Sequence, residues 1–147
     1  MTIIQPPLIG GKTIEQWDRL WVVVPGGVTR YHPQLRHQCG LYRMSLGGQI
    51  TVVGTGTDKD GGLAKRLSDF RRSSRSARNH YAGELIYTHR DELVVEVLIT
   101  GSGPDARENA QQLKTPMILL HKPVWTVSNA PYRRKGMMGE ELVRDSD

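Results

Sequence analysis

The chain has 147 residues, which is the length of a single domain that can bury a core without cross-links. It contains one cysteine, Cys39, which excludes an intramolecular disulfide, and no apolar run near the roughly 20 residues of a membrane span. The net charge of +5 is by itself a weak indication of an acidic partner. Because the first residues also lack the pattern of a signal peptide, we expect a cytoplasmic protein with no membrane contact.

Residues 1–38 are expected to form an N-terminal extension with one short helix and one short strand. Thr13 is suited to cap the helix, with Gln16 three residues later as its capping-box partner. Four apolar residues, 21–24, then predict a strand that stops at a Pro-Gly-Gly sequence. Residues 28–37 are expected to be a polar connection.

A β-hairpin is predicted next, with strands at 39–45 and 49–54 around a Leu-Gly-Gly turn. The glycine-rich loop that follows lacks the Gly-Lys-Ser/Thr ending of a phosphate-binding loop. It leads into a predicted helix at 63–72, on which three apolar residues recur at helical spacing. These are Leu63, Leu67 and Phe70.

Two further strands are predicted at 84–87 and 92–100. A helix should begin near Asp105, and Pro116 should kink or interrupt it. The order β-β-α-β-α lacks the regular alternation of a parallel sheet, so the predicted class is α+β, with a domain at 39–131. Residues 132–147 are expected to form a flexible charged tail.

Positive charge is concentrated in residues 65–78. This segment has six basic residues and one acid, a net charge of +5 that equals the charge of the whole chain. Five of the six are arginine, whose planar guanidinium suits phosphate oxygens. The segment therefore predicts binding to a polyanion, first of all nucleic acid and in particular DNA. The basic residues are Lys65, Arg66, Arg71, Arg72, Arg75 and Arg78.

Several short motifs, in this order and spacing, resemble those of the GIY-YIG nuclease superfamily. They are Gly40-Leu41-Tyr42, Val52-Val53-Gly54, the arginine in Lys65-Arg66-Leu67, and Lys122-Pro123-Val124-Trp125. The resemblance covers roughly residues 39–126. It implies a small three-stranded antiparallel sheet flanked by helices, and hydrolysis of phosphodiesters with one bound divalent cation.

The resemblance also implies roles for single residues. Tyr42 would help to activate water, Arg66 would contact the scissile phosphate, and a glutamate on the later helix would hold Mg²⁺. Glu108 is the acid on that helix that could serve as this catalytic residue and metal ligand. At the usual spacing, however, the position of the glutamate is occupied by Lys114, which would repel a metal ion and could bind phosphate. The second motif has Val52 where the family has a tyrosine.

Three functions are consistent with these patterns. The first is a GIY-YIG-fold protein that binds nucleic acid through an eroded, inactive nuclease site and needs no metal. The second is an active, divergent Mg²⁺-dependent endonuclease that uses Tyr42, Arg66 and Glu108. The third is a small inhibitor or adaptor whose basic helix binds an acidic protein. The charge cluster at 65–78 favours the first.

Overall fold

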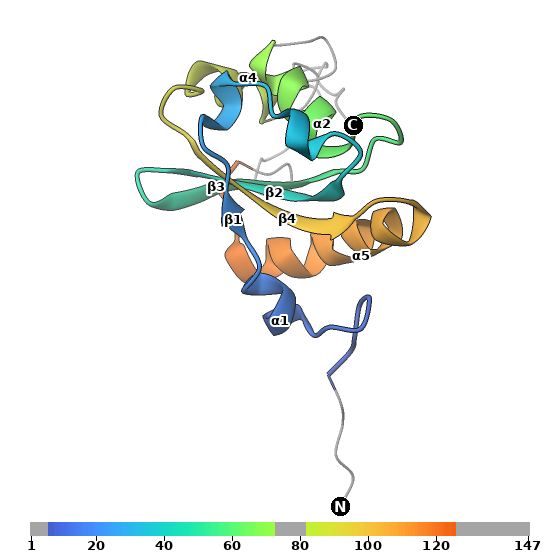
Figure 1. Ribbon diagram of the computed structural model, residues 1–147. Coiled ribbons are helices and arrows are strands. Elements are labelled where there is room, and N and C mark those ends of the chain that lie inside the picture. Colours follow the sequence, from blue (N-terminus) through green and yellow to red (C-terminus); the bar gives the residue numbers. More distant parts are fainter. Residues whose placement is uncertain (1–5, 73–81, 126–147) are drawn as a thin grey trace, which may run out of the picture.

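The computed structural model describes residues 6–72 and 82–125. It has the predicted α+β class: a four-stranded antiparallel sheet with helices on both faces (Figure 1). We call the face covered by α2 (Gly62–Arg71) and α4 (Gly83–Thr88) the α2 face. The opposite face, covered by α5 (Pro104–His121) with α1 (Ile14–Asp18) beside it, is the α5 face. The predicted tail, residues 132–147, lies outside the described residues.

The sheet has the strand order β1-β4-β2-β3 and not the three strands that the resemblance implies. The additional strand is β1 (Val22–Val23), which pairs with β4 (Val94–Gly101). The N–H of Val24 extends this pairing by donating to the carbonyl of Val95 at 2.8 Å. The predicted strand at 21–24 therefore exists, but it belongs to the same sheet as the hairpin.

The hairpin is confirmed as β2 (Cys39–Leu46) and β3 (Gln49–Gly56). Its two-residue turn consists of Gly47 and Gly48, whose φ angles are 59° and 84°. Both are positive, as a type I′ turn requires, and residues with a side chain adopt such angles at a cost. The turn sets the pairing of Leu46 with Gln49, and a bulge between Met44 and Ser45 shifts the register for the rest of the pair.

On the α2 face, the predicted apolar stripe of α2 is confirmed: Leu63, Leu67 and Phe70 are each 1% exposed or less. The predicted strand at 84–87 is wrong, because this segment is the helix α4. A short apolar run fits a strand or a helix equally well. In α4 the helical spacing brings Ala82 and Ile86, four residues apart, into the same core.

On the α5 face, α5 continues from Pro104 to His121, so the predicted interruption at Pro116 is wrong, whereas the alternative of a kink stays a prediction. Pro104 occupies the first turn, where its missing N–H costs nothing. Buried residues on both sides of Pro116 hold the helix against Leu41 and Leu98 of the sheet. This packing outweighs the lost hydrogen bond. The buried residues of the helix are Ala106, Ala110, Leu113 and Met117.

The N-terminal segment packs on the α5 face. The predicted capping box of α1 is confirmed: the N–H of Gln16 donates to Thr13 Oγ1 at 3.1 Å, and Gln16 Oε1 accepts from the N–H of Thr13 at 2.8 Å. Trp17 is buried against α5 and donates its Nε1–H to the carbonyl of Ile9 at 2.8 Å. None of the described helices is long and apolar enough to cross a membrane.

Candidate nucleic-acid interface

Tyr42 and Arg66, two residues singled out by the resemblance, meet on the α2 face. Tyr42 lies on β2, is 4% exposed, and packs its ring edge-on against Phe70 with 5.5 Å between ring centroids. Arg66 on α2 places its Cζ 4.8 Å from the centre of the same Phe70 ring. Its side chain is also hydrogen-bonded to the phenol of Tyr42. The sheet and α2 thus bring together a phenol, a guanidinium and a phenyl ring.

Burial raises the pKa of the Tyr42 phenol, and the charge and hydrogen bond of Arg66 offset only part of this rise. The phenol is therefore neutral at physiological pH. A tyrosine that takes a proton from water must ionise more readily than a free tyrosine, and it must be in contact with that water. The surroundings of Tyr42 give it the opposite properties, those of a core residue with its hydroxyl hydrogen-bonded.

The glycines of the two short motifs have packing roles. Gly54 is opposite Tyr42 in the β2–β3 pair, and a Cβ at this position would lie 2.6 Å from Cζ of Tyr42. A Cβ at Gly40 would collide with the carbonyl oxygen of Leu98, at the irregularity where β2 pairs with β4. Any larger residue at either position would push a ring or a strand away. The motifs are therefore partly explained by the fold itself.

Glu108 and Lys114 lie on α5 and so on the other face of the sheet from Tyr42 and Arg66 (Figure 1). Glu108 is exposed, and its Oε2 accepts a hydrogen bond from Gln112 Nε2 at 3.2 Å. Lys114 is also exposed. The described residues include no group of three His, Cys, Asp or Glu side chains placed to hold a metal ion. The surroundings of Glu108 do not fit a magnesium centre shared with Tyr42 and Arg66.

The basic side chains of α2 differ in how far they are neutralised. Asp69, which is 5% exposed, pairs with Lys65 at 3.1 Å and with Arg72 at 3.7 Å. Arg71 donates to Ser68 Oγ at 3.5 Å, and its buried Nε has no hydrogen-bond partner among the described residues. The helix thus keeps a net positive charge around one buried acid. Arg75 and Arg78, the remaining members of the predicted cluster, lie outside the described residues.

In the loop before α2, two backbone amides are hydrogen-bonded to a side chain of the same loop. Asp58 Oδ1 accepts from the N–H groups of Asp60 at 2.9 Å and Gly61 at 2.7 Å. The hydrogen bond from Gly61 is the main cause that lowers the pKa of the Asp58 carboxyl, and burial opposes it. Because these two amides are already bonded to a carboxylate, the loop does not offer them to a phosphate.

Two arginines on the α2 face are not among the binding residues that the sequence predicts. The segment predicted as a polar connection forms two short 3₁₀ turns, η1 (Gly27–Thr29) and η2 (Pro33–Leu35), and both pack against α2. They carry the exposed side chains of Arg30 and Arg36, for which no ion pair with an acid occurs among the described residues. A signal was present: between Asp18 and Asp58 the sequence has four arginines and no acidic residue.

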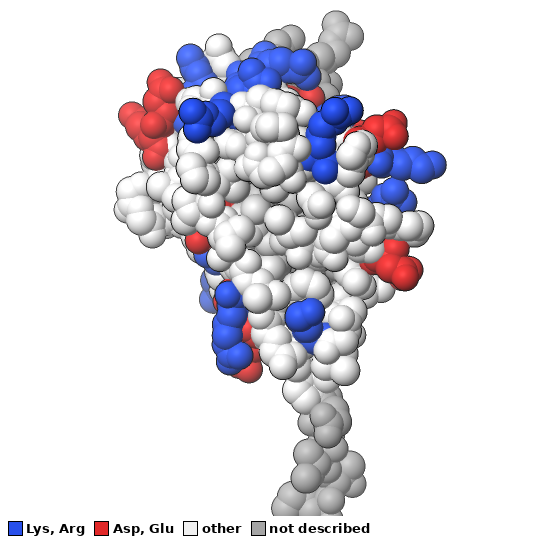
Figure 2. Space-filling view, viewed as in Figure 1, with Lys and Arg blue, Asp and Glu red and all other residues white. Residues whose placement is uncertain are grey.

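Charged side chains occur on several parts of the surface. Figure 2 shows Lys and Arg side chains in the upper part of the molecule, the side of α2 and α4, and also in its lower part, with acidic side chains mainly at the two edges. The contribution of η1 and η2 extends the positive charge of α2 beyond the segment predicted from the sequence. Such a surface attracts polyanions over the distance of a Debye length.

The α5 face holds a polar network that the sequence does not indicate. Arg43 on β2 pairs with Glu96 on β4 at 2.8 Å, and its Cζ lies 4.4 Å from the ring centre of Trp21. Asp18 Oδ1 accepts from His121 Nε2 at 2.7 Å and from Trp21 Nε1 at 2.9 Å. The network joins α1, β2, β4 and the end of α5. These contacts tie these elements to one another on this face of the sheet.

Comparisons of this chain with models of protein families, with curated proteins and with solved structures found no match.

Proposed function

We propose that the protein binds nucleic acid, DNA in particular, through the α2 face, and that its GIY-YIG-like fold serves binding and not cleavage. The observation that carries this proposal is the division of the implied catalytic set. Tyr42 and Arg66 lie on the α2 face with the basic side chains, whereas Glu108 lies on the α5 face.

Binding is supported by the number and placement of the cations. α2 presents Arg66, Arg71 and Arg72 from one helix, and η1 and η2 add Arg30 and Arg36 beside it. Guanidinium groups bind phosphates through two parallel hydrogen bonds, and each neutralised phosphate releases counterions. A strand that crosses this side of the molecule would meet several such groups in succession.

Two features support a protein that does not cleave nucleic acid. One is the buried, neutral phenol of Tyr42, and the other is the presence of Val52 and Lys114 at positions where the family has catalytic residues. The buried phenol has a raised pKa and is hydrogen-bonded to Arg66. Val52, which is 6% exposed, stands where the family has its second tyrosine and belongs to the core. Lys114 brings a positive charge to the position that the resemblance assigns to a metal ligand.

The proposal is tested by charge reversal. In the triple variant Arg71→Glu, Arg72→Glu, Arg75→Glu, we expect the Kd for random-sequence DNA to rise at least about tenfold, because several phosphate contacts are lost. The control is Arg19→Glu, Lys114→Glu, Lys122→Glu, which changes the net charge equally at exposed positions of α1 and α5. Fluorescence anisotropy at several salt concentrations measures both the Kd and its salt dependence.

Because Arg71 is partly buried, the double variant Arg72→Glu, Arg75→Glu is measured beside the triple variant, with thermal unfolding as a check of the fold. We expect the double variant to remain folded and to lose most of the DNA affinity, with a somewhat lower melting temperature because Arg72 no longer pairs with Asp69. Unchanged affinity in folded variants would overturn the proposal. So would a wild-type protein without affinity for random DNA, a result that would favour an acidic protein as the partner.

A further inference from the structure

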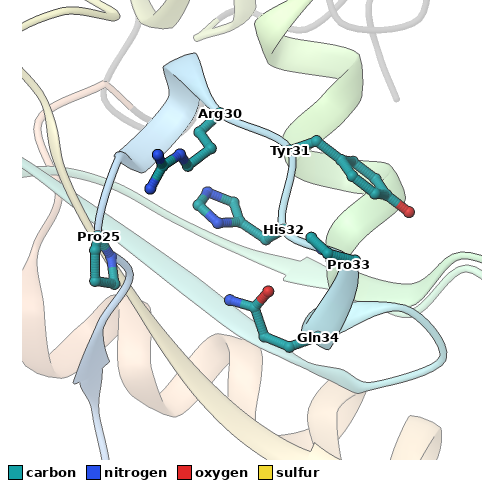
Figure 3. Close-up of a pocket in the computed structure, with 6 residues that line it drawn as sticks. All are labelled: Pro25, Arg30, Tyr31, His32, Pro33 and Gln34. Atoms are coloured by element: carbon teal, nitrogen blue, oxygen red, sulfur yellow. The ribbon is translucent and has the colours of Figure 1, made fainter.

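A hollow of about 350 Å³ lies beside α2, between Pro25 and the turn that carries Arg30 to Gln34 (Figure 3). The imidazole of His32 lies between the side chains of Arg30 and Gln34, and Pro25 faces them from the other side. Tyr31 points away from these side chains, on the side of α2. The lining thus combines a cation, an amide and an imidazole with a proline ring.

Hydrogen bonds and burial hold the walls of this hollow in place. His32, which is 3% exposed, bonds through Nε2 to the carbonyl of Gly27 at 2.7 Å and so ties η2 to η1. Thr29 Oγ1 donates to the carbonyl of Gly26 at 2.8 Å. Val28 and Leu35, from the two 3₁₀ turns, are buried in the core of the α2 face. The hollow is therefore formed before any ligand arrives, which lowers the entropic cost of binding.

The polar side chains of the hollow can form further hydrogen bonds or an ion pair with a ligand. Since a carbonyl only accepts, His32 Nε2 is the donor in its bond to Gly27, and in the neutral ring Nδ1 then carries a lone pair. The Gln34 amide offers both donors and an acceptor. The alkyl part of Arg30 lies over Gly26, where an added Cβ would be 2.8 Å from Arg30 Cδ. Its guanidinium forms no ion pair within the described part of the chain.

We propose that this hollow binds one unpaired nucleotide of a nucleic-acid strand, with the base in the hollow and its phosphate on Arg30. The inference rests on the proposed function and adds a preference for single strands. The hollow is an open depression of the surface, and its volume lies at the lower end of the range for small-molecule sites, about 300–1,000 Å³. A base in a duplex cannot enter without being unstacked, whereas an unpaired base is free to do so.

The neighbouring features fit the course of such a strand. Tyr31 is 44% exposed, and its ring offers a flat surface at the rim on which the next base can stack. Beyond it, α2 supplies guanidinium groups for the following phosphates. The Gln34 amide can pair with the hydrogen-bonding edge of a base, as amides do in other complexes.

The test compares one labelled oligothymidylate of about 20 nucleotides with a duplex of equal length, by fluorescence anisotropy at fixed salt. Gln34→Ala removes the amide that contacts the base, so we expect it to raise the Kd for the single strand at least about threefold. Because the variant leaves the charge unchanged, the Kd for the duplex should stay within about twofold. Arg30→Ala should raise the single-strand Kd about tenfold. The control Arg19→Ala removes another exposed arginine, outside the hollow, and should change neither Kd by more than about twofold.

Failure of this inference is distinguishable from failure of the proposed function. If Gln34→Ala has no effect, or if Arg30→Ala weakens single strand and duplex equally, the hollow is not a nucleotide site. The proposed function still stands in that case, provided that reversal of the charges on α2 abolishes binding. If the wild-type protein binds neither probe, both proposals are overturned.

Discussion

The side chain of Tyr42 lies between Gly54 on the neighbouring strand and Phe70 on α2, with its phenol bonded to Arg66. The resemblance assigns Tyr42 and Arg66 to catalysis and Gly54 to a motif. All three residues also have a role in packing. Gly54 leaves room for the ring, the ring supports α2, and Arg66 satisfies a buried hydroxyl. A phenol in these surroundings is buried and neutral, and so it is unsuited to accept a proton from water.

Because Tyr42 is buried, we expect the stability of the protein to decrease at alkaline pH. Its pKa is raised by burial, so the folded state keeps the proton longer than the unfolded state. The contribution of this group is fully present below the unfolded pKa of about 10 and is lost as the pH rises through the folded pKa. We expect the urea midpoint to fall above pH 10 in the wild type, and to fall less in Tyr42→Phe.

At neutral pH, Tyr42→Phe should lower the free energy of unfolding by about 1 kcal/mol, the value of one hydrogen bond, and should leave DNA affinity unchanged. Urea unfolding at pH 8 and at pH 10.5, with anisotropy at pH 8, measures these effects. An equal loss of stability at high pH in both proteins would contradict the role assigned to the buried phenol.

Among the elements, α2 links the core to the proposed interface. Its apolar stripe is buried on the sheet, and its basic side chains surround the buried acid Asp69. That acid fixes Lys65 and Arg72 and at the same time neutralises part of their charge. The ion pairs of Asp69 therefore stabilise the helix, but they also reduce the positive charge that is available to a polyanion.

Replacement of Asp69 should shift this balance. In Asp69→Asn, Lys65 and Arg72 lose a carboxylate partner, and we expect the Kd for DNA to fall about threefold with a steeper salt dependence. The free energy of unfolding should drop by about 1–2 kcal/mol, because the pairs are lost from a largely buried acid. Anisotropy titrations at three salt concentrations and urea unfolding measure the two effects. Weaker DNA binding by a folded Asp69→Asn protein would contradict the placement of the interface on α2.

The polar network on the α5 face is expected to contribute stability alone. In Glu96→Gln, the largely buried Arg43 loses its closest carboxylate, and we expect the free energy of unfolding to fall by about 1–3 kcal/mol. The control is Glu92→Gln, because the side chain of Glu92 is 68% exposed beside His89 and should contribute less than about 0.5 kcal/mol. Urea unfolding compares the two. Equal, small effects would show that the network is only a surface feature.

The parts of the fold that local signals determine could be predicted from the sequence. A two-glycine turn fixed the hairpin, Thr13 and Gln16 fixed the start of α1, and the apolar spacing of α2 indicated its buried side. The run at 84–87 was too short to distinguish a strand from a helix. Pro116 was overridden by packing on both of its sides. The pairing of β1 with β4 joins segments about 75 residues apart, for which a single sequence carries no local signal.

The candidate site was predictable to a smaller degree. The resemblance led to Tyr42 and Arg66, which do meet, but it did not reveal that Tyr42 is buried. The placement of Glu108 depends on which side of α5 packs on the sheet, and this is set by Ala106, Ala110 and Leu113. Arg30 and the hollow beside it depend on how η1 and η2 fold onto α2, which no local pattern specifies.

At the scale of the whole molecule, the sheet separates two different surfaces. The α2 face joins the basic helix to the loop with Arg30 and Arg36, and the α5 face holds Glu108, Lys114 and the internal polar network. Binding on the first surface requires nothing from the second. Cleavage with the implied residue set would require groups from both.

The most direct test is to incubate supercoiled plasmid with the purified protein in Mg²⁺, in Mn²⁺ and in EDTA, beside the Glu108→Ala variant. Agarose gels then report nicking and retention in the same samples at rising salt. We predict retention that weakens steeply with salt, equal in wild type and variant, and no nicking under any condition. Metal-dependent nicking that Glu108→Ala abolishes would contradict the account and show that the protein is a nuclease.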